Sequence, residues 1–252
     1  MNAVRYERIG RGYAQTRRED PHLARRIHAA LGDARTVVNV GAGAGSYEPH
    51  DRHVVAVEPS DVMARQRPPE LAAAIRASAG ALPLRDQSVD AAMAVLTVHH
   101  WDDQQQQGVR ELRRVARGPV AIVTIDAEVS SRMWLIADYL PEVAALDYRI
   151  MPPINVIADW LGGTVGTEIV ETPRDTPDWT LMSFWAHPER VLDPVARGST
   201  SGFARTPEEV VERVVSAVEA DLSTGEWDRR YGHLRELDAF DAGLRLLVSM
   251  PG

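Results

Sequence analysis

The sequence of 252 residues contains neither cysteine nor lysine. The lack of cysteine excludes disulfide bonds, thiolate catalysis and cysteine-ligated metal centres. Because all 28 basic residues are arginine, Schiff-base chemistry and the lysine of a phosphate-binding loop are excluded too. Four histidines, His50, His53, His99 and His100, form no recognised ligand spacing with nearby carboxylates, so we expect no metal site.

Long apolar runs and an excess of positive charge are also missing. No window approaches 18 uncharged apolar residues, and the first 20 residues are polar, so we expect a cytoplasmic protein without membrane contact. The net charge of -8 argues against nucleic acid as a partner, because binding it requires clustered basic residues. We therefore expect a small-molecule substrate, and a monomer or homodimer with one large domain.

The first half of the chain alternates strand and helix patterns. Short valine-rich runs at 36–40, 53–58, 92–98 and 119–126 are typical of buried parallel strands. Helical patterns precede the first run and separate the last two, at 20–32 and 102–118. This order predicts an α/β fold with right-handed crossover connections.

The second half is richer in aromatic residues and helix patterns. Residues 127–163 read as apolar helices, 164–171 as a strand and 243–250 as a closing strand. Residues 206–209, with the sequence TPEE, predict a capping box that begins a helix with a valine stripe. Most of the aromatic residues are expected in the core, and the remainder in the wall of an apolar acceptor pocket.

The segment "VVNVGAGAGSYEPHDRHVVAVEPS", residues 37–60, carries the strongest functional signal. Gly41, Gly43 and Gly45 follow a strand, where a loop without Cβ atoms can approach a ligand closely. Glu58 ends the next strand and is placed to accept hydrogen bonds from the hydroxyl groups of a ribose. The glycine spacing and the short connection after Ser46 fit a dinucleotide poorly and favour a nucleoside cofactor without phosphate. A tight turn with no ligand is the alternative interpretation.

These segments, with "ASAGALPLRDQSVDAAMAVLTVHHW" and "ELRRVARGPVAIVTID", resemble the class I S-adenosylmethionine-dependent methyltransferases, in particular the small-molecule type 11 branch. The resemblance covers residues 35–126. It implies a Rossmann-like, doubly wound, seven-stranded sheet with helical cap insertions. Residues 1–252 would form one domain: a cofactor-binding core at 1–126, cap elements at 127–163 and 187–240, and the remaining strands at 164–172 and 242–250.

The resemblance also implies roles for single residues in binding S-adenosylmethionine. Around the methionine part it places the glycine loop with Ala42, and Thr97 at the end of a strand. Asn39 stands where the family usually has an acid. The other implied contacts are Glu58 at the ribose, Pro59, Ser60, Met63, Ser78 and Ala79 around the adenine, and Tyr13 and Arg17 closing over the cofactor.

Catalysis is expected where the strands carrying His99, His100 and Asp126 end. A histidine held by a carboxylate would be a general base for a hydroxyl acceptor, although methyl transfer by positioning alone is the alternative. The predicted function is methyl transfer to a small organic acceptor, at oxygen, in bacterial specialised metabolism. The other interpretations are a methyltransferase-fold protein that catalyses a non-methylating reaction such as a cyclisation, a non-catalytic cofactor binder and, last, an NAD-dependent oxidoreductase.

Overall fold

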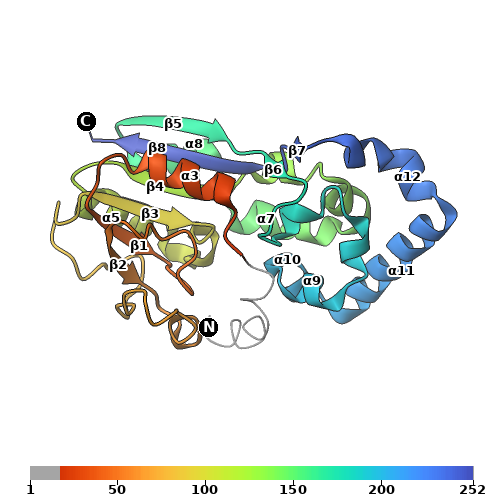
Figure 1. Cartoon of the computed structure of the whole chain (residues 1–252), viewed down its shortest axis with the longest axis horizontal. Coiled ribbons are helices and arrows are strands. Elements are labelled where there is room, and N and C mark those ends of the chain that lie inside the picture. Colours follow the sequence, from red (N-terminus) through yellow and green to blue (C-terminus); the bar gives the residue numbers. More distant parts are fainter. Residues whose placement is uncertain (1–17, 252) are drawn as a thin grey trace.

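The fold is built around one mixed β-sheet. A computed structural model describes residues 18–251 of the chain. The six strands of the sheet have the spatial order β2-β1-β3-β4-β8-β5, in which the first four are parallel and β8 runs antiparallel to both of its neighbours (Figure 1). The strands are β1 (Thr36–Val40), β2 (His53–Val57), β3 (Ala91–Val95), β4 (Val120–Ile125), β5 (Thr164–Ile169) and β8 (Leu244–Met250).

Helices cover both faces of this sheet because successive residues of a strand point to opposite sides. Val37 faces α3 (Pro21–Ala30), whose Leu23 and Ile27 are buried against it. The next residue, Val38, belongs to the opposite face, which is covered by α5 (Gln105–Val115) and α8 (Ile154–Leu161). The predicted α/β layers are therefore confirmed.

Among residues 18–251 the sheet has six strands where seven were expected. The expected seventh strand would pair with the free edge of β2. There, Ile75 forms a single parallel bridge with Val57, the last residue of β2. Its amide donates to Ala56 and its carbonyl accepts from Glu58, at 2.8 and 3.1 Å. Apart from Ile75, residues 70–79 contain none of the β-branched or aromatic residues that favour strands, so the pairing stops at one residue.

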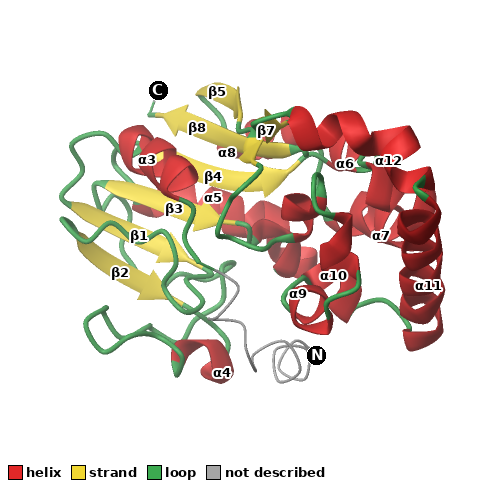
Figure 2. Cartoon of the chain, turned by 45° about the vertical axis from the view of Figure 1, so that its right-hand side comes forward, coloured by secondary structure: helices red, strands yellow, loops and turns green. Residues whose placement is uncertain are grey.

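A helical cap lies beside the carboxyl ends of the parallel strands (Figures 1 and 2). Its buried centre contains Trp134, Trp185 and Trp227. Besides the helices already named, the structure contains α4 (Asp61–Ala64), α6 (Ala127–Ser130), α7 (Pro141–Ile150), α9 (Pro194–Gly198), α10 (Ser201–Ala204), α11 (Glu208–Thr224) and α12 (Glu226–Tyr231), with short turns η1 (Val98–His100), η2 (Asp102–Gln104), η3 (Leu135–Tyr139), η4 (Leu181–Phe184), η5 (Pro188–Val191) and η6 (Gly232–Glu236), and a small ribbon of β6 (Thr172–Pro173) and β7 (Ala239–Phe240).

Two details of the second half differ from the expectation. Helix α8 was expected in the cap, but Ile157 and Leu161 pack on the sheet with α5 and β8. The capping box does not form: α11 begins after Pro207, and the Thr206 hydroxyl donates to the Gly202 carbonyl at 2.9 Å. A proline between the threonine and the helix leaves the side chain closer to the preceding turn, α10, than to the first amides of α11.

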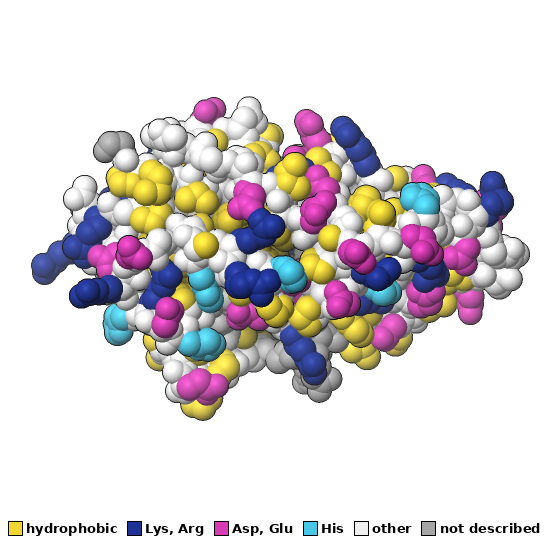
Figure 3. Space-filling view, turned by 45° about the horizontal axis from the view of Figure 1, so that its top comes forward, with side chains coloured by type: hydrophobic (Ala, Val, Ile, Leu, Met, Phe, Trp, Pro, Cys, Tyr) yellow, Lys and Arg dark blue, Asp and Glu magenta, His cyan; other side chains and the backbone are white. Residues whose placement is uncertain are grey.

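The surface is mixed in charge. On the face drawn in Figure 3, arginine and acidic side chains are interspersed over both the sheet half and the cap half. Within residues 18–251, no helix has the length and apolar character needed to cross a membrane.

Candidate active site

The glycine loop after β1 is held tightly against the neighbouring strands. Gly41, Gly43 and Gly45 all have positive φ, at 73°, 52° and 100°. The amide of Gly41 donates to the Val57 carbonyl at 2.9 Å. A Cβ atom on Gly41 would lie 2.0 Å from Oγ1 of Thr97, so no side chain fits between the loop and the end of β3. The conformation and the close approach together require glycine at this position.

Glu58, at the end of β2, is fixed by backbone amides on both of its carboxylate oxygens. Oε2 accepts from the Gly43 amide at 2.8 Å, and Oε1 accepts from the Ser60 amide at 2.7 Å. The residue is buried, yet it lies in the walls of two cavities. Its remaining acceptor positions are therefore oriented in advance toward a ligand.

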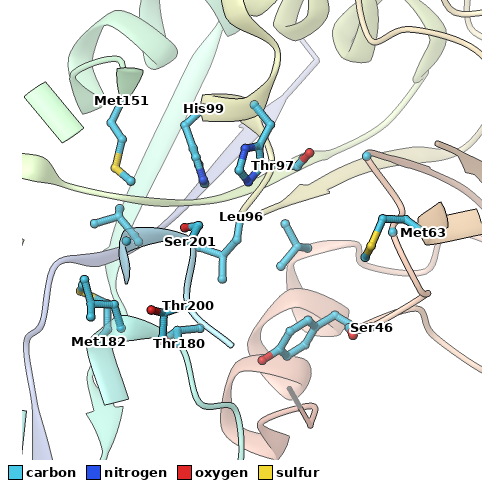
Figure 4. A pocket seen from close by; sticks show the side chains of 18 of the residues that line it. Ser46, Met63, Leu96, Thr97, His99, Met151, Thr180, Met182, Thr200 and Ser201 are labelled. Carbon is cyan, nitrogen blue, oxygen red and sulfur yellow. The ribbon is translucent and has the colours of Figure 1, made fainter. Parts of the chain in front are cut away.

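Two adjoining cavities meet at this loop. The first, called here the core slot, has a volume of about 270 Å³ and lies between the ends of β1 and β2, α4 and Trp101. The second, the cap cavity, has a volume of about 150 Å³ and lies between the strand ends and the cap. The residues common to both are Gly41, Glu58, Thr97 and His100. In Figure 4, Met151 and Met182 lie on one side of the cap cavity, with Met63 and Thr97 on the other.

A buried polar group lies under the glycine loop. The Asn39 amide nitrogen donates to Oε1 of Glu48 at 3.0 Å, and Nη2 of Arg67 donates to Oε2 of the same carboxylate at 2.8 Å. The side chains of Arg67 and Glu48 are 3% and 1% exposed. Asn39 thus has a carboxylate neighbour from a distant part of the loop, which the sequence motif did not indicate.

The predicted hydrogen bond between a histidine and Asp126 does not form. Asp126 caps α6 by accepting from the Glu128 amide at 3.1 Å, its other oxygen lies 3.8 Å from Nε of Arg245, and it lines neither cavity. An aspartate that directly precedes a helix can accept a hydrogen bond from the first amides of that helix. Asp126 makes this local bond in α6 instead of one with a histidine.

His99 and His100 both line the cap cavity, with ring centroids 4.0 Å apart. Nδ1 of His100 lies 2.8 Å from Nη2 of Arg205. Because a guanidinium only donates, Nδ1 must accept, and the proton of the neutral ring is on Nε2. With Nδ1 occupied by Arg205, that nitrogen of His100 is not available as a base.

A carboxylate that the sequence interpretation missed, Asp147 of α7, lies in the cap wall of the same cavity. It is 8% exposed, and its side chain makes no hydrogen bond to any residue from 18 to 251. Burial raises the pKa of Asp147 to about 7, and the positive charge of Arg205 limits the rise. The signal for it was its spacing four residues after Val143 and four before Met151, on the buried side of a helix.

Comparisons with known proteins agree with this geometry. A family model described as a methyltransferase domain matches residues 38–122. One solved structure, described as a methyltransferase from an antibiotic biosynthesis pathway of Anabaena variabilis, is 30% identical, with a TM-score of 0.85 over 93% of this chain and 99% of that one. The chain belongs to the S-adenosylmethionine-dependent methyltransferases.

More distant structures share the fold of this methyltransferase. A SAM-dependent methyltransferase of Thermotoga maritima is 20% identical, with a TM-score of 0.51 over 71% of this chain and 88% of that one. Phosphoethanolamine N-methyltransferase 2 of Haemonchus contortus, solved with S-adenosylhomocysteine, is 13% identical, with a TM-score of 0.51 over 91% and 52%. A search of curated proteins gives no match.

The cofactor of the methyltransferase is S-adenosylmethionine, and the residues present fit it. The backbone of Gly41 forms part of the wall of both cavities and that of Gly43 part of the wall of the cap cavity, while Glu58, fixed by two amides, lines both. A sulfonium nucleoside carries no phosphate, which agrees with a binding loop free of lysine.

The cofactor-binding residues predicted for the methyltransferase divide into five groups by position. Gly41, Glu58 and Thr97 line both cavities, Pro59, Ser60 and Ala79 line the core slot, and Asn39, Ala42, Gly43 and Met63 line the cap cavity. Gly45 and Ser78 lie in neither wall, and Gly45 packs instead against Leu71. Tyr13 and Arg17 lie outside the described residues.

The wall that the cap contributes to the cap cavity is aliphatic rather than aromatic. Val143, Met151, Leu181 and Met182 supply the apolar wall of the cap cavity, with hydroxyls from Thr180, Thr200 and Ser201. The tryptophans of the second half pack elsewhere, most of them in the centre of the cap. The expectation that some of these aromatic residues wall an acceptor pocket stays a prediction, and none of the tryptophans lines the cap cavity.

Proposed function

We propose that the enzyme methylates an oxygen atom of a small, largely apolar acceptor bound in the cap cavity, and that Asp147 accepts the proton of the hydroxyl group. The observation that carries the proposal is the position of Asp147, a buried carboxylate in the aliphatic wall formed by Val143, Leu181 and Met182. A hydroxyl group loses its proton when it is methylated, so an oxygen acceptor benefits from a nearby base.

The pKa of Asp147 suits this role. A base works best when its pKa is near the working pH, and burial raises the pKa of Asp147 to about 7. Above that pH the carboxylate is ionised in apolar surroundings. It is then a stronger proton acceptor than an exposed aspartate.

The other residues of the site bind and orient. The cofactor supplies an electrophilic methyl group on a sulfonium, and Glu58 with the glycine loop would hold its nucleoside end. Arg205 fixes the ring of His100 in the cavity wall by donating to Nδ1. The cap wall and the strand ends would hold the acceptor between them, so that much of the acceleration comes from orientation.

A role in specialised metabolism is supported by the Anabaena variabilis protein, whose description places it in an antibiotic biosynthesis pathway. An aliphatic cap wall with the hydroxyls of Thr180, Thr200 and Ser201 and the carboxylate of Asp147 also suits a small hydroxylated molecule better than a highly charged metabolite.

The test is formation of S-adenosylhomocysteine from S-adenosylmethionine with a panel of small phenols, alcohols and primary amines. We expect turnover with hydroxyl compounds, and we expect Asp147→Asn to lower it by about 10²- to 10⁴-fold. Glu142→Gln is the matched control, because this exposed carboxylate of the same helix pairs with Arg213 away from the cavity. Methylation of amines alone, or full activity of Asp147→Asn on hydroxyl compounds, would contradict the proposal.

A further inference from the structure

Asn39, Glu48 and Arg67 form a buried hydrogen-bonded group under the glycine loop, and the direction of each hydrogen bond in it is fixed. Both oxygens of Glu48 are occupied, one by the Asn39 amide nitrogen and one by Arg67. A carboxylate only accepts, so the nitrogen of Asn39 must face Glu48. Asn39 also lines the cap cavity. The amide oxygen is therefore the atom that it can present to a ligand there.

Arg67 fixes the other end of this group. It donates to the Ala72 carbonyl at 2.9 Å and to the Gly43 carbonyl at 3.4 Å, in addition to its bond with Glu48. The guanidinium thus connects the segment after α4 to the glycine loop. It also balances the charge of Glu48, so that the group with Asn39 is neutral overall.

We propose that Glu48 is a positioning residue that orients the Asn39 amide, with its oxygen toward the cap cavity, to accept a hydrogen bond from the ammonium group of the cofactor's amino acid part. The site is built for an amide at position 39. A carboxylate at that position would place two acceptors of like charge about 3 Å apart in a buried site, with Arg67 as the one cation bonded to them among residues 18–251.

This arrangement predicts that Glu48→Gln reverses the polarity of the pair. The oxygen of the new amide at position 48 can accept from Arg67 while its nitrogen faces position 39, so Asn39 must turn its own oxygen toward position 48. The Asn39 amide nitrogen then faces the cavity and repels an ammonium group. The hydrogen bond between positions 39 and 48 survives, but Arg67 loses its buried counter-charge, so we expect both affinity and stability to fall.

The experiment measures binding of S-adenosylhomocysteine by titration calorimetry, together with the midpoint of thermal unfolding. For Glu48→Gln we expect affinity to fall about tenfold or more, because a donor replaces an acceptor, and we expect a lower unfolding midpoint because Arg67 loses its buried counter-charge. For Asn39→Asp we expect both quantities to fall. The double variant Asn39→Asp with Glu48→Gln should recover both, because the amide at position 48 then donates to a carboxylate at position 39, whose other oxygen offers an acceptor to the cavity.

Glu70→Gln is the matched control, since it removes an exposed carboxylate from the same segment without touching this group. Unchanged affinity in Glu48→Gln would overturn the proposal. A double variant that folds but binds as weakly as Glu48→Gln would overturn it too. If the double variant does not fold, the affinity of Glu48→Gln decides, measured at a temperature well below its unfolding midpoint. At that temperature the variant is folded, so a merely structural role predicts the affinity of the original protein, whereas the proposal predicts the tenfold loss.

Discussion

The two walls of the cap cavity are built in different ways. The core wall, formed by the ends of β1, β2 and β3, consists of backbone and of side chains whose hydrogen bonds are already made, as Glu58 and Asn39 illustrate. The cap wall is aliphatic and holds Asp147, a carboxylate without a hydrogen bond to any described residue. The difference suggests that the core wall was shaped to bind one constant cofactor, and the cap wall to supply chemistry to an acceptor.

The largest expected effect is that of Asp147→Asn, in the cap wall, on the free energy of unfolding. The pKa of Asp147, about 7 in the folded protein, lies above its ordinary value of 3.8. Between these two values the folded state holds a proton that the unfolded chain has released, so the free energy of unfolding falls as the pH rises from about 4 to 7. Above pH 7 we expect Asp147→Asn to increase it by up to about 4 kcal/mol.

Urea denaturation of both proteins at pH 4 and pH 8 measures this effect. The two curves should nearly coincide at pH 4, where both side chains are neutral, and separate at pH 8. An asparagine variant that is less stable at pH 8 would show that the cap wall accommodates the charge without cost.

The next effect concerns the core wall. Gly41→Ala places a Cβ atom 2.0 Å from Oγ1 of Thr97 at a φ of 73°, and we expect a loss of about 3 kcal/mol in stability together with loss of S-adenosylhomocysteine binding. Gly225→Ala is the matched control, because Gly225 has a φ of 75° with nothing within 4 Å. It should cost about 1 kcal/mol and leave binding unchanged. Equal losses in the two variants would mean that the contact with Thr97 is unimportant.

The smallest effect is expected at Asp126, which the sequence pattern placed in catalysis and the structure places at the start of α6. Asparagine caps a helix about as well as aspartate, so Asp126→Asn should lower turnover by less than about threefold. Steady-state rates with any accepted substrate measure this. A loss as large as that of Asp147→Asn would return Asp126 to the active site.

The fold was largely predictable because its signals are local. The valines of β1 and β2 and the glycines between them specify a strand, a tight loop and the next strand with little help from the rest of the chain. The position of α8 was not predictable, since the apolar stripe of Ile157 and Leu161 would suit the cap as well as the sheet. The sequence likewise does not reveal that pairing at the edge of β2 stops after one residue, Ile75.

The site was predictable on its core side and not on its cap side. Glu58 follows a strand at a fixed distance from the glycine loop, so its position follows from chain order. Asp147 is far from the glycine loop in sequence. Only the packing of α7 near the strand ends brings its buried carboxylate into the wall of the cap cavity. Asp126 was misassigned because a local amide competes for its carboxylate, which the order of strands does not reveal.

We propose that Asp147 of the cap accepts the proton while the core wall binds the cofactor. The most direct test is the pH dependence of kcat/KM for an accepted hydroxyl substrate, in the original enzyme and in Asp147→Asn, with S-adenosylhomocysteine affinity measured in parallel. We predict a rise in kcat/KM with pH through about 7 that is absent in the variant, with equal cofactor affinity in both. The same rise in the variant would contradict the account, as would a loss of activity explained by weaker cofactor binding.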